Sequence, residues 1–231
     1  MNHLVLFAKA PRLGQVKTRL LSVLSPLRVR SLYIAFLRDS VATARRVRGV
    51  HRFAIAFAPA DGERLLRQEL GRMARGWSFL PQRGGDLGER MRRAFVENFQ
   101  QGAKRIVILG ADSPTLPARL VENAFAALQT ADVVLGPSTD GGFYLIGVRR
   151  LKAEGRMSFL ERGIEWSTER VLEQTIAAAR RAKLKLHLLD PWYDVDDAAS
   201  LRFLRTHLCA LAACRSGEFP KHTWRALSKM R

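Results

Sequence analysis

The sequence contains, near its middle, the stretch Arg105-Ile106-Val107-Ile108-Leu109-Gly110-Ala111-Asp112-Ser113-Pro114-Thr115-Leu116. Its first five residues form an apolar, β-branched run that is typical of a buried parallel strand. Gly110 and Pro114 then stop the strand and turn the backbone sharply. Asp112 is therefore expected just beyond the carboxyl end of a central strand, where open α/β sheets bind ligands. A single Asp in a turn more often bonds its own backbone, so the rest of the chain decides its role.

The composition is that of an ordinary globular protein. The chain has 231 residues and is 47% hydrophobic, which suffices for one domain with a sizeable core. No apolar run approaches the roughly 18 residues of a membrane span. The first apolar stretch, residues 3–8, is too short for a signal peptide. We therefore expect a cytoplasmic protein.

The formal net charge of +18 is the most unusual bulk property. A surplus of this kind can indicate binding to nucleic acid. However, the basic residues are spread over several predicted helices, and aromatic residues do not alternate with them as in proteins that bind single strands. A solvated basic surface is favoured, with anionic phosphate substrates as a second cause. A non-catalytic protein that binds polyanions or nucleic acid is kept as an alternative.

Strand-like and helix-like segments alternate along the chain. The patterns predict strands over residues 3–8, 53–58, 77–81, 105–109, 132–136, 143–148 and 185–189. They predict helices over residues 27–47, 61–74, 87–100, 118–128, 168–182 and 198–207, with Asp61, Thr168 and Asp197 as candidate N-caps. The short turn at residues 137–142 favours antiparallel neighbours. We therefore expect a three-layer α/β/α, Rossmann-like domain over residues 1–208 with a mixed, mostly parallel sheet, and a basic tail or helix over residues 209–231.

Several loops at strand ends have the composition of a ligand site. Residues 9–20 carry two Lys, two Arg, a Pro and a Gly, a mixture that can wrap phosphates, although the Walker spacing is absent. Residues 82–91 place three glycines and an Asp before a helix, which lets backbone approach an anion. Asp140 precedes two glycines and is either a turn former or a carboxylate for an acceptor. Residues 190–197 hold four carboxylates, of which N-capping by Asp197 explains one.

These loops are expected to meet at one edge of the sheet. Basic side chains of the first loop would then share a crevice with Asp112 and with the acidic segment at residues 190–197. A phosphate site with two sources of carboxylates indicates a bridging divalent cation, Mg²⁺ or Mn²⁺.

Five motifs follow one another along residues 3–205. They are Phe7-Ala8-Lys9-Ala10-Pro11 with Gly14-x-Val16-Lys17-Thr18-Arg19-Leu20, then Gly85-Asp86-Leu87-Gly88-Glu89-Arg90-Met91, Gly110-x-Asp112-x-Pro114-x-Leu116, Gly136-Pro137-x-x-Asp140-Gly141-Gly142-Phe143-Tyr144-Leu145-Ile146-Gly147 and Asp194-Val195-Asp196. Together they resemble the bacterial DUF2064 family, the glycosyltransferase-like proteins also called radical-SAM/selenodomain-associated transferase 1. That family is similar to the guanylyltransferases of molybdenum-cofactor and phospholactate metabolism. The resemblance implies the nucleotide-diphospho-sugar transferase (GT-A-like) fold.

The resemblance also implies site residues. Asp112 matches the metal-binding Asp that ends the central strand, and Asp196 matches the late carboxylate that completes the metal site. We expect Asp112 and Asp140 to be catalytic, Asp140 by orienting or deprotonating an acceptor hydroxyl. The positions expected to bind nucleotide or phosphate are Ala8, Lys9, Gly14, Lys17, Arg19, Gly85, Asp86, Leu87 and Gly88.

Two motifs differ from those of relatives. The central motif reads Gly-Ala-Asp where glycosyltransferases commonly have Asp-x-Asp. The late motif reads Asp-Val-Asp-Asp-Ala-Ala-Ser-Leu where relatives often have Thr-Pro-Glu-Asp-Leu. It therefore stays open which of Asp194, Asp196 and Asp197 faces the metal.

The leading hypothesis is a cation-assisted transferase that takes a nucleoside-diphosphate sugar as donor and a small molecule as acceptor. Lys17 and Arg19 would stabilise the charge of the leaving diphosphate. The alternative is a guanylyltransferase-like nucleotidyltransferase that releases pyrophosphate from a nucleoside triphosphate. We expect neither a specific nucleic acid nor a membrane as a partner.

Overall fold

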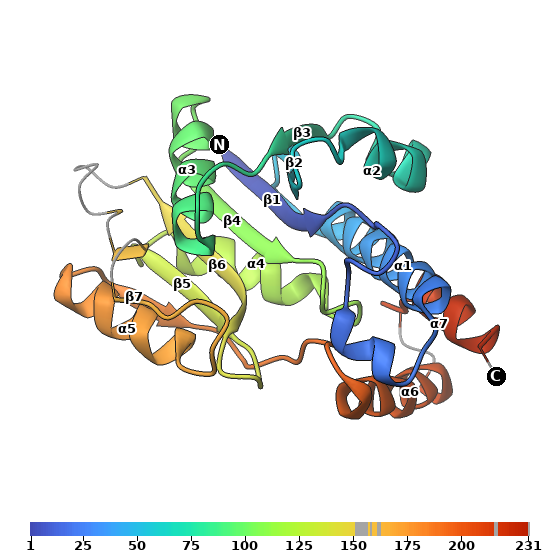
Figure 1. Cartoon of the computed structure of the whole chain (residues 1–231). Coiled ribbons are helices and arrows are strands. Elements are labelled where there is room, and N and C mark those ends of the chain that lie inside the picture. Colours follow the sequence, from blue (N-terminus) through green and yellow to red (C-terminus); the bar gives the residue numbers. More distant parts are fainter. Residues whose placement is uncertain (151–156, 158, 161–162, 215–216, 231) are drawn as a thin grey trace.

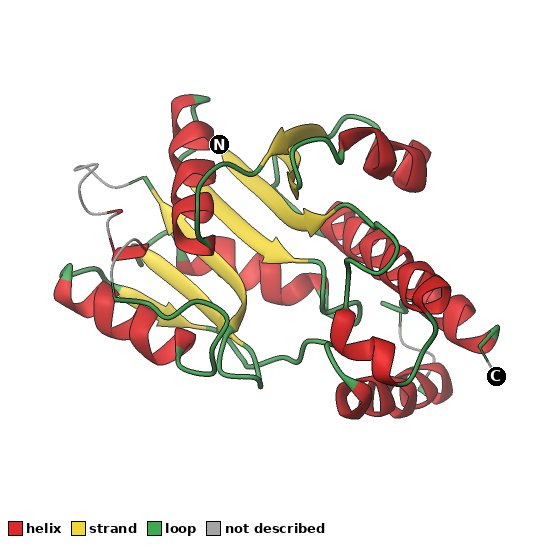
Figure 2. Ribbon diagram, viewed as in Figure 1, coloured by secondary structure: helices red, strands yellow, loops and turns green. Residues whose placement is uncertain are grey.

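A computed structural model describes residues 1–150, 157, 159–160, 163–214 and 217–230. Helices lie on both sides of a central seven-stranded sheet (Figure 1 and Figure 2). Its strands run in the order β3-β2-β1-β4-β6-β5-β7, with β6 antiparallel to both neighbours and the other pairs parallel. The expected three-layer α/β fold with a mixed, mostly parallel sheet is confirmed. The strands are β1 (Asn2–Lys9), β2 (Arg52–Ala58), β3 (Ser78–Pro81), β4 (Arg105–Gly110), β5 (Val133–Pro137), β6 (Phe143–Arg149) and β7 (Leu186–Leu188).

Helices cover the sheet in two layers. Side chains of α1, α2 and α4 pack on one face, and side chains of α3 and α5 pack on the other. In β4, Val107 and Leu109 face the first layer, whereas Ile106 and Ile108 face the second. Because both faces are buried, the strand has the continuous apolar sequence that identified it. The helices are α1 (Pro26–Arg46), α2 (Glu63–Leu70), α3 (Leu87–Gln100), α4 (Ala118–Ala127) and α5 (Val171–Arg181), with the 3₁₀ helix η2 (Gly71–Ala74) after α2.

A third hydrophobic cluster lies beside the sheet. It joins α1 to the 3₁₀ helix η1 (Thr18–Ser22), α6 (Ala198–Ala213) and α7 (Lys221–Ser228) (Figure 1). Leu208 is only 1% exposed in this cluster, and α6 continues past it to Ala213. The domain boundary expected at residue 208 therefore falls inside a helix. Within the expected tail, residues 215–216 and 231 lie outside the described residues. No helix in the described part of the chain is long and apolar enough to cross a membrane.

Two carboxylates fix the last segment to the domain. Asp39 of α1 accepts hydrogen bonds from the backbone N–H groups of His222 (3.1 Å) and Thr223 (2.7 Å), at the start of α7. Glu218 accepts one from the N–H of Ala118 (2.7 Å), where α4 begins without a side-chain cap of its own. Carboxylates satisfy the free N–H groups of a helix N-terminus and are stabilised by its dipole. The described part of residues 209–231 is therefore folded against the domain.

Two of the three expected N-caps are wrong. α2 begins after Gly62, because Asp61 instead forms an ion pair with Arg12 at 2.5 Å. α5 begins three residues after Thr168, at Val171, and the hydroxyl of Thr168 accepts a hydrogen bond from the N–H of Arg170 at 3.3 Å. Asp197 is confirmed, since its carboxylate accepts the N–H of Ser200 (2.8 Å) in a capping box at the start of α6.

The strand register positions the candidate site. β1 and β4 are parallel, with Phe7 opposite Gly110, so both strands end at the same edge of the sheet. β5 and β7 are also parallel to each other, and the segment after β7 reaches the same edge. There the N–H of Val195 donates to the carbonyl of Asp112 at 3.0 Å. The loops after β1, β4 and β7 therefore meet.

Candidate active site

Lys17 joins two of the carboxylates that the sequence singled out. Its Nζ lies 2.6 Å from Oδ1 of Asp112 and 2.6 Å from Oδ1 of Asp196. The Lys17 side chain is 5% exposed, whereas those of Asp112 and Asp196 are 43% and 37% exposed. The ammonium is thus covered by the protein, while both carboxylates remain open to solvent and to a ligand.

The surroundings of Lys17 keep its side chain charged. Burial alone would lower the pKa of the ammonium, but the charges of Asp112 and Asp196 outweigh it and hold the pKa above the usual value. The backbone of Lys17 has φ 47° and ψ 47°, in the left-handed region. For a residue with a side chain this conformation costs on the order of 1 kcal/mol, and such residues concentrate at functional sites.

Asp194 links two turns and is close enough to Asp112 and Lys17 for their charges to act on it. Its carboxylate accepts hydrogen bonds from the hydroxyls of Ser113, next to Asp112, and Ser138, after β5 (3.0 Å). Burial first, and then the charge of Asp112, raise the pKa of Asp194 to about 6, while the bond from Ser113 and the charge of Lys17 lower it. Asp194 therefore connects the turns that carry Asp112 and Asp140.

The three aspartates of the late motif thus have different surroundings. Asp194 is held by two serine hydroxyls, Asp196 contacts Lys17, and Asp197 caps α6. The N–H of Asp196 also donates to Oγ of Ser200 at 3.0 Å, which ties its backbone to the start of α6. Of the three, Asp196 is the one whose carboxylate contacts the Lys17 ammonium.

Tyr33 of α1 holds the beginning of the first loop. Its hydroxyl accepts the N–H of Lys9 at 2.9 Å and donates to the carbonyl of the same residue at 3.2 Å. Burial first, and then the charge of Asp112, raise the pKa of the Tyr33 hydroxyl above its usual value. Tyr33 therefore acts as a neutral hydrogen-bonding group under the site.

Asp140 occupies a tight turn between β5 and β6. Its Oδ1 accepts the N–H of Gly142 at 3.0 Å, which is the turn-forming contact typical of Asp. Gly141 has φ +87°, and a Cβ at this position would lie 2.0 Å from the carbonyl oxygen of Glu169. The turn is therefore packed directly on the segment before α5. Asp140 itself is exposed, and its charge acts on Asp194.

The glycine-rich loop ends at the start of α3. Asp86 caps this helix by accepting the N–H of Glu89 at 2.8 Å, and Oε2 of Glu89 accepts the N–H of Gly85 at 2.8 Å. A Cβ at Gly88 would lie 2.5 Å from the ring of Trp166. Gly85 and Leu87 are exposed, whereas Gly88 is buried by that ring. The carbonyl oxygen of Leu160, 2.0 Å from such a Cβ, and the ring of Trp166 together account for the glycine at position 88.

The other predicted positions lie in or next to the first loop. Ala8 is 4% exposed and faces the layer of α1, so only its backbone can meet a ligand. The side chains of Lys9 and Arg19 and the backbone of Gly14 are exposed. The charge of Arg19 helps to lower the pKa of Asp197, after the hydrogen bonds from Ser200. Arg19 therefore lies on the side of the late acidic motif.

Sequence reasoning did not identify Ser113, Ser138 and Tyr33 as parts of the site. Ser113 is adjacent to Asp112, and Ser138 lies in the turn of Asp140, but serine is frequent in turns and is not distinctive there. Tyr33 lies within the apolar pattern of a helix. These contacts depend on tertiary packing.

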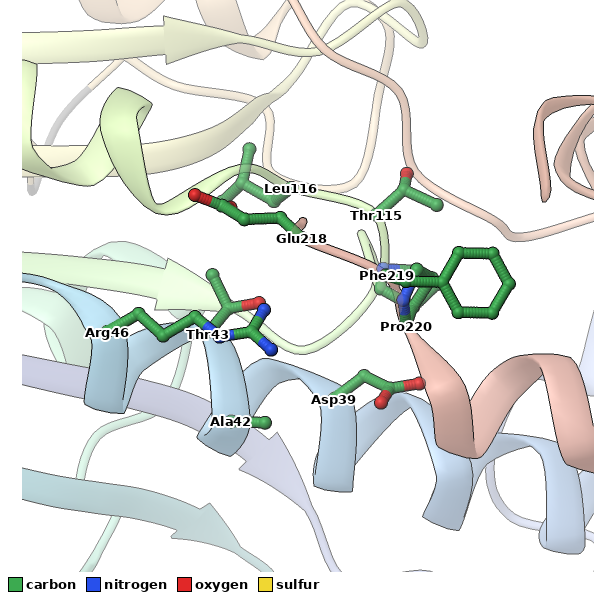
Figure 3. A pocket seen from close by; sticks show the side chains of 10 residues that line it. Asp39, Ala42, Thr43, Arg46, Thr115, Leu116, Glu218, Phe219 and Pro220 are labelled. Carbon is green, nitrogen blue, oxygen red and sulfur yellow. The ribbon is translucent and has the colours of Figure 1, made fainter. Parts of the chain in front are cut away.

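A separate pocket lies between α1, the turn after Asp112 and the start of α7 (Figure 3). Asp39, Thr115 and Glu218 are among its lining residues, and the predicted site residues are not. Its carboxylates are the two that cap α7 and α4. We therefore interpret it as part of the packing of the last segment.

The carboxylates suit a divalent cation only in part. No group of three or more His, Cys, Asp and Glu side chains in the described part of the chain could hold a metal ion by itself. Asp112 and Asp196 nevertheless direct one oxygen each to a single cation, the Lys17 ammonium. Two carboxylate oxygens fit Mg²⁺ or Mn²⁺ when substrate phosphates and water supply the remaining ligands, provided that Lys17 withdraws.

The chain is similar to a bacterial protein family and to a solved structure over almost its whole length. Residues 41–168 match the family model described as "Uncharacterized protein conserved in bacteria (DUF2064)". The crystal structure of a proposed nucleotide-diphospho-sugar transferase from Desulfovibrio desulfuricans G20 is 32% identical, with a TM-score of 0.85. The match covers 99% of this chain and 94% of that one. No curated protein matches the sequence.

More distant structures share the fold. A nucleotidyl transferase from Methanothermobacter thermautotroptrophicus is 13% identical with a TM-score of 0.61, over 90% of this chain and 97% of that one. The 4-diphosphocytidyl-2C-methyl-D-erythritol synthase from Anaerococcus prevotii DSM 20548 is 10% identical with a TM-score of 0.60, over 90% and 98%. The expected GT-A-like fold is confirmed.

Proposed function

Because this chain belongs to the bacterial family DUF2064, and its fold is that of nucleotide-diphospho-sugar transferases, we propose that it transfers a sugar from a nucleoside diphosphate to a small-molecule acceptor. The observation that carries the proposal is the contact of Lys17 with Asp112 and Asp196 at the edge where three loops meet. The Lys17 ammonium and two solvent-exposed carboxylates, at the carboxyl ends of parallel strands, suit a diphosphate that binds together with a divalent cation.

The basic residues are proposed to act on the diphosphate that leaves. Lys17 and Arg19 follow each other on the first loop and η1, and Lys9 precedes them where β1 ends. Positive groups beside a leaving phosphate stabilise the charge that develops on it. The ion pair orients Lys17 before substrate binds, and Tyr33 fixes the backbone of Lys9.

Asp112 and Asp196 are proposed to hold Mg²⁺ or Mn²⁺. When bound there, the cation supplies charge stabilisation to the diphosphate. Lys17 then leaves the position between the carboxylates, and its ammonium is close enough to reach the same phosphates. Asp112 and Asp196 also keep Lys17 protonated until that exchange.

Asp140 is proposed to orient the acceptor hydroxyl or to remove its proton. One of its oxygens is engaged by the N–H of Gly142. The residue is exposed, and Ser138 and Asp194 connect its turn to that of Asp112. These contacts support the proposal, because they link the turn of Asp140 to the turn of Asp112.

Calorimetric titration tests the proposal. Uridine, guanosine, cytidine and adenosine diphosphates are titrated into the protein with and without Mn²⁺. We expect at least one of them to bind, and more tightly with Mn²⁺. Absence of binding to every nucleotide at millimolar concentration would refute the proposal. Binding that fades with salt and is equal for all nucleotides and for RNA would instead support the polyanion alternative.

Nucleotidyl transfer is a second candidate, and the basic first loop favours it. Lys9, Lys17 and Arg19 offer more positive charge than a diphosphate requires, and a nucleoside triphosphate would use it. The distant structures of a nucleotidyl transferase and a 4-diphosphocytidyl-2C-methyl-D-erythritol synthase have this fold. Release of pyrophosphate from a nucleoside triphosphate in the presence of phosphorylated acceptors would distinguish this reaction from glycosyl transfer.

A further inference from the structure

Gly110, half-buried at the end of β4, leaves open space on the sheet next to Asp112, which we call the hollow. Ile106 and Ile108 point into the layer of α3 and α5, so the alternation of the strand turns Gly110 towards the same layer. Among the described residues, a Cβ at Gly110 would meet only the backbone nitrogen of Asp112, at 4.0 Å. The backbone of Gly110 is outside the left-handed region, so this glycine is not required by its conformation.

Aromatic rings flank the hollow on both sides. Phe7 lies opposite Gly110 on β1 and packs in the layer of α3 and α5. Phe143, at the start of β6, packs in the same layer on the other side of β4. Both rings are half-buried. The missing side chain of Gly110 thus opens a space between two aromatic side chains that are not fully covered.

Trp166 extends this wall to the glycine-rich loop. Its ring meets Phe143 edge to face, with centroids 6.4 Å apart and planes at 85°. The same ring covers Gly88 in the first turn of α3, which lies over this face of the sheet (Figure 1). Trp166 is half-buried. The wall therefore runs from the predicted nucleotide loop to the turn of Asp140, which directly precedes Phe143.

We infer that the hollow over Gly110 binds the sugar ring of a nucleoside-diphosphate sugar, with Phe143 and Trp166 against the apolar face of the ring. This inference rests on the proposed function. Gly110 is two residues before Asp112, so a ring attached to a diphosphate at Lys17 and Asp112 reaches it. Ligand pockets commonly combine aromatic walls with a few polar groups. Here Asp112 follows Gly110 by two residues and Asp140 precedes Phe143 by three, so both carboxylates would be available to accept hydrogen bonds from ring hydroxyls.

The variant Gly110→Ala fills the hollow with little disturbance of the free protein, because the added Cβ has no close neighbour among the described residues. We expect its melting temperature and its Kd for UDP and GDP, measured with Mn²⁺, to equal those of the wild type. Its affinity for UDP-glucose, UDP-N-acetylglucosamine or GDP-mannose, whichever the wild type binds best, should fall about tenfold. Trp166→Leu should lower the same affinity. Gly217→Ala, at another open glycine, is the matched control.

The outcomes separate this inference from the proposed function. If Gly110→Ala weakens UDP and UDP-sugar equally, the hollow holds the nucleotide and the inference is wrong. If it weakens neither, or if the wild type binds the diphosphates but none of the sugar nucleotides, no sugar ring occupies the hollow and the inference is again wrong. If the wild type binds no nucleotide at all, the proposed function itself fails.

Discussion

The Lys17 ammonium lies 2.6 Å from the Asp112 carboxylate, although the two residues belong to loops that follow different strands. The parallel pairing of β1 and β4 brings these loops together. The same ammonium reaches Asp196, after the last strand. The ammonium of one buried lysine side chain therefore connects the loops after β1, β4 and β7 before any ligand binds.

Lys17→Met removes this cation but keeps much of the side-chain volume. We expect nucleoside diphosphates with Mn²⁺ to bind at least about tenfold more weakly, because a positive group beside the phosphates is lost. Mn²⁺ alone should bind at least as tightly as to the wild type, because Lys17 no longer occupies the space between Asp112 and Asp196. Calorimetry measures both affinities. Lys185→Met, at an exposed lysine of another loop, is the control, and unchanged nucleotide affinity in Lys17→Met would contradict the assignment.

Asp194→Ala should destabilise the protein by about 2 kcal/mol, because it leaves the hydroxyls of Ser113 and Ser138 without their acceptor. Asp194→Asn should cost less, since an amide can accept one hydrogen bond. Urea unfolding measures these differences. The exposed Asp190 of the same segment provides the control, and its change to Asn should leave the free energy of unfolding within about 0.5 kcal/mol. Equal stability of all three variants would show that Asp194 does not link the two turns.

Asp39→Ala should destabilise the protein by about 2 kcal/mol. The change removes the acceptor for two N–H groups at the start of α7, and Asp39 itself is only 3% exposed. Hydrogen exchange should show that the amides of His222 and Thr223 lose protection more than those of β4. If protection falls equally everywhere, α7 is not docked through this contact.

His3 should make the protein less stable in mild acid. It is 1% exposed, its Nδ1 bonds Oδ1 of Asn98 at 2.9 Å, and its Nε2 has no hydrogen-bond partner in the described part of the chain. Burial is the main reason that its pKa is below the usual value of 6.5. The unfolded chain therefore binds more protons, so stability is complete above pH 6.5 and is lost as the pH falls towards the folded pKa.

The variant His3→Gln isolates this contribution, because glutamine does not titrate. His207 and His222 also have lowered pKa values and remain in both proteins. Unfolding free energies at pH 7.5 and 5.5 should differ more in the wild type than in the variant. The same difference in both proteins would contradict the assignment to His3.

The sheet was predictable because its strands are covered on both faces. Residues such as Val107 and Ile108 face opposite layers and are both buried, so β4 has an unmistakable apolar sequence. The capping of α6 by Asp197 was predictable because a cap depends on residues close in sequence. The starts of α2 and α5 were not predictable in this way. Asp61 forms an ion pair with Arg12 of another loop, and α2 begins after Gly62. Thr168 accepts the N–H of Arg170, and α5 begins at Val171.

The site was predictable as a meeting of loops, but its contacts were not. Parallel strands imply that the loops of Lys17 and Asp112 lie at one edge of the sheet. The left-handed backbone conformation at Lys17 could not be predicted, because the residue is not a glycine. The role of Asp194 depends on two serines from other turns. Asp39 is buried in α1, and its partners are in the last helix. Such pairs follow from tertiary packing, which local patterns do not encode.

Asp112→Asn tests the central claim most directly, since it keeps the shape of the side chain and the backbone contact with Val195. The measurement is a calorimetric titration of the wild type and the variant with the nucleoside diphosphate that the wild type binds best, with and without Mn²⁺. The account predicts that the variant loses the part of the affinity that depends on Mn²⁺, while its melting temperature stays close to that of the wild type because Asp112 is 43% exposed. Equal Mn²⁺-dependent affinity in both proteins, or a variant that unfolds while its binding is otherwise intact, would show that Asp112 is a turn residue and not a ligand of the cation.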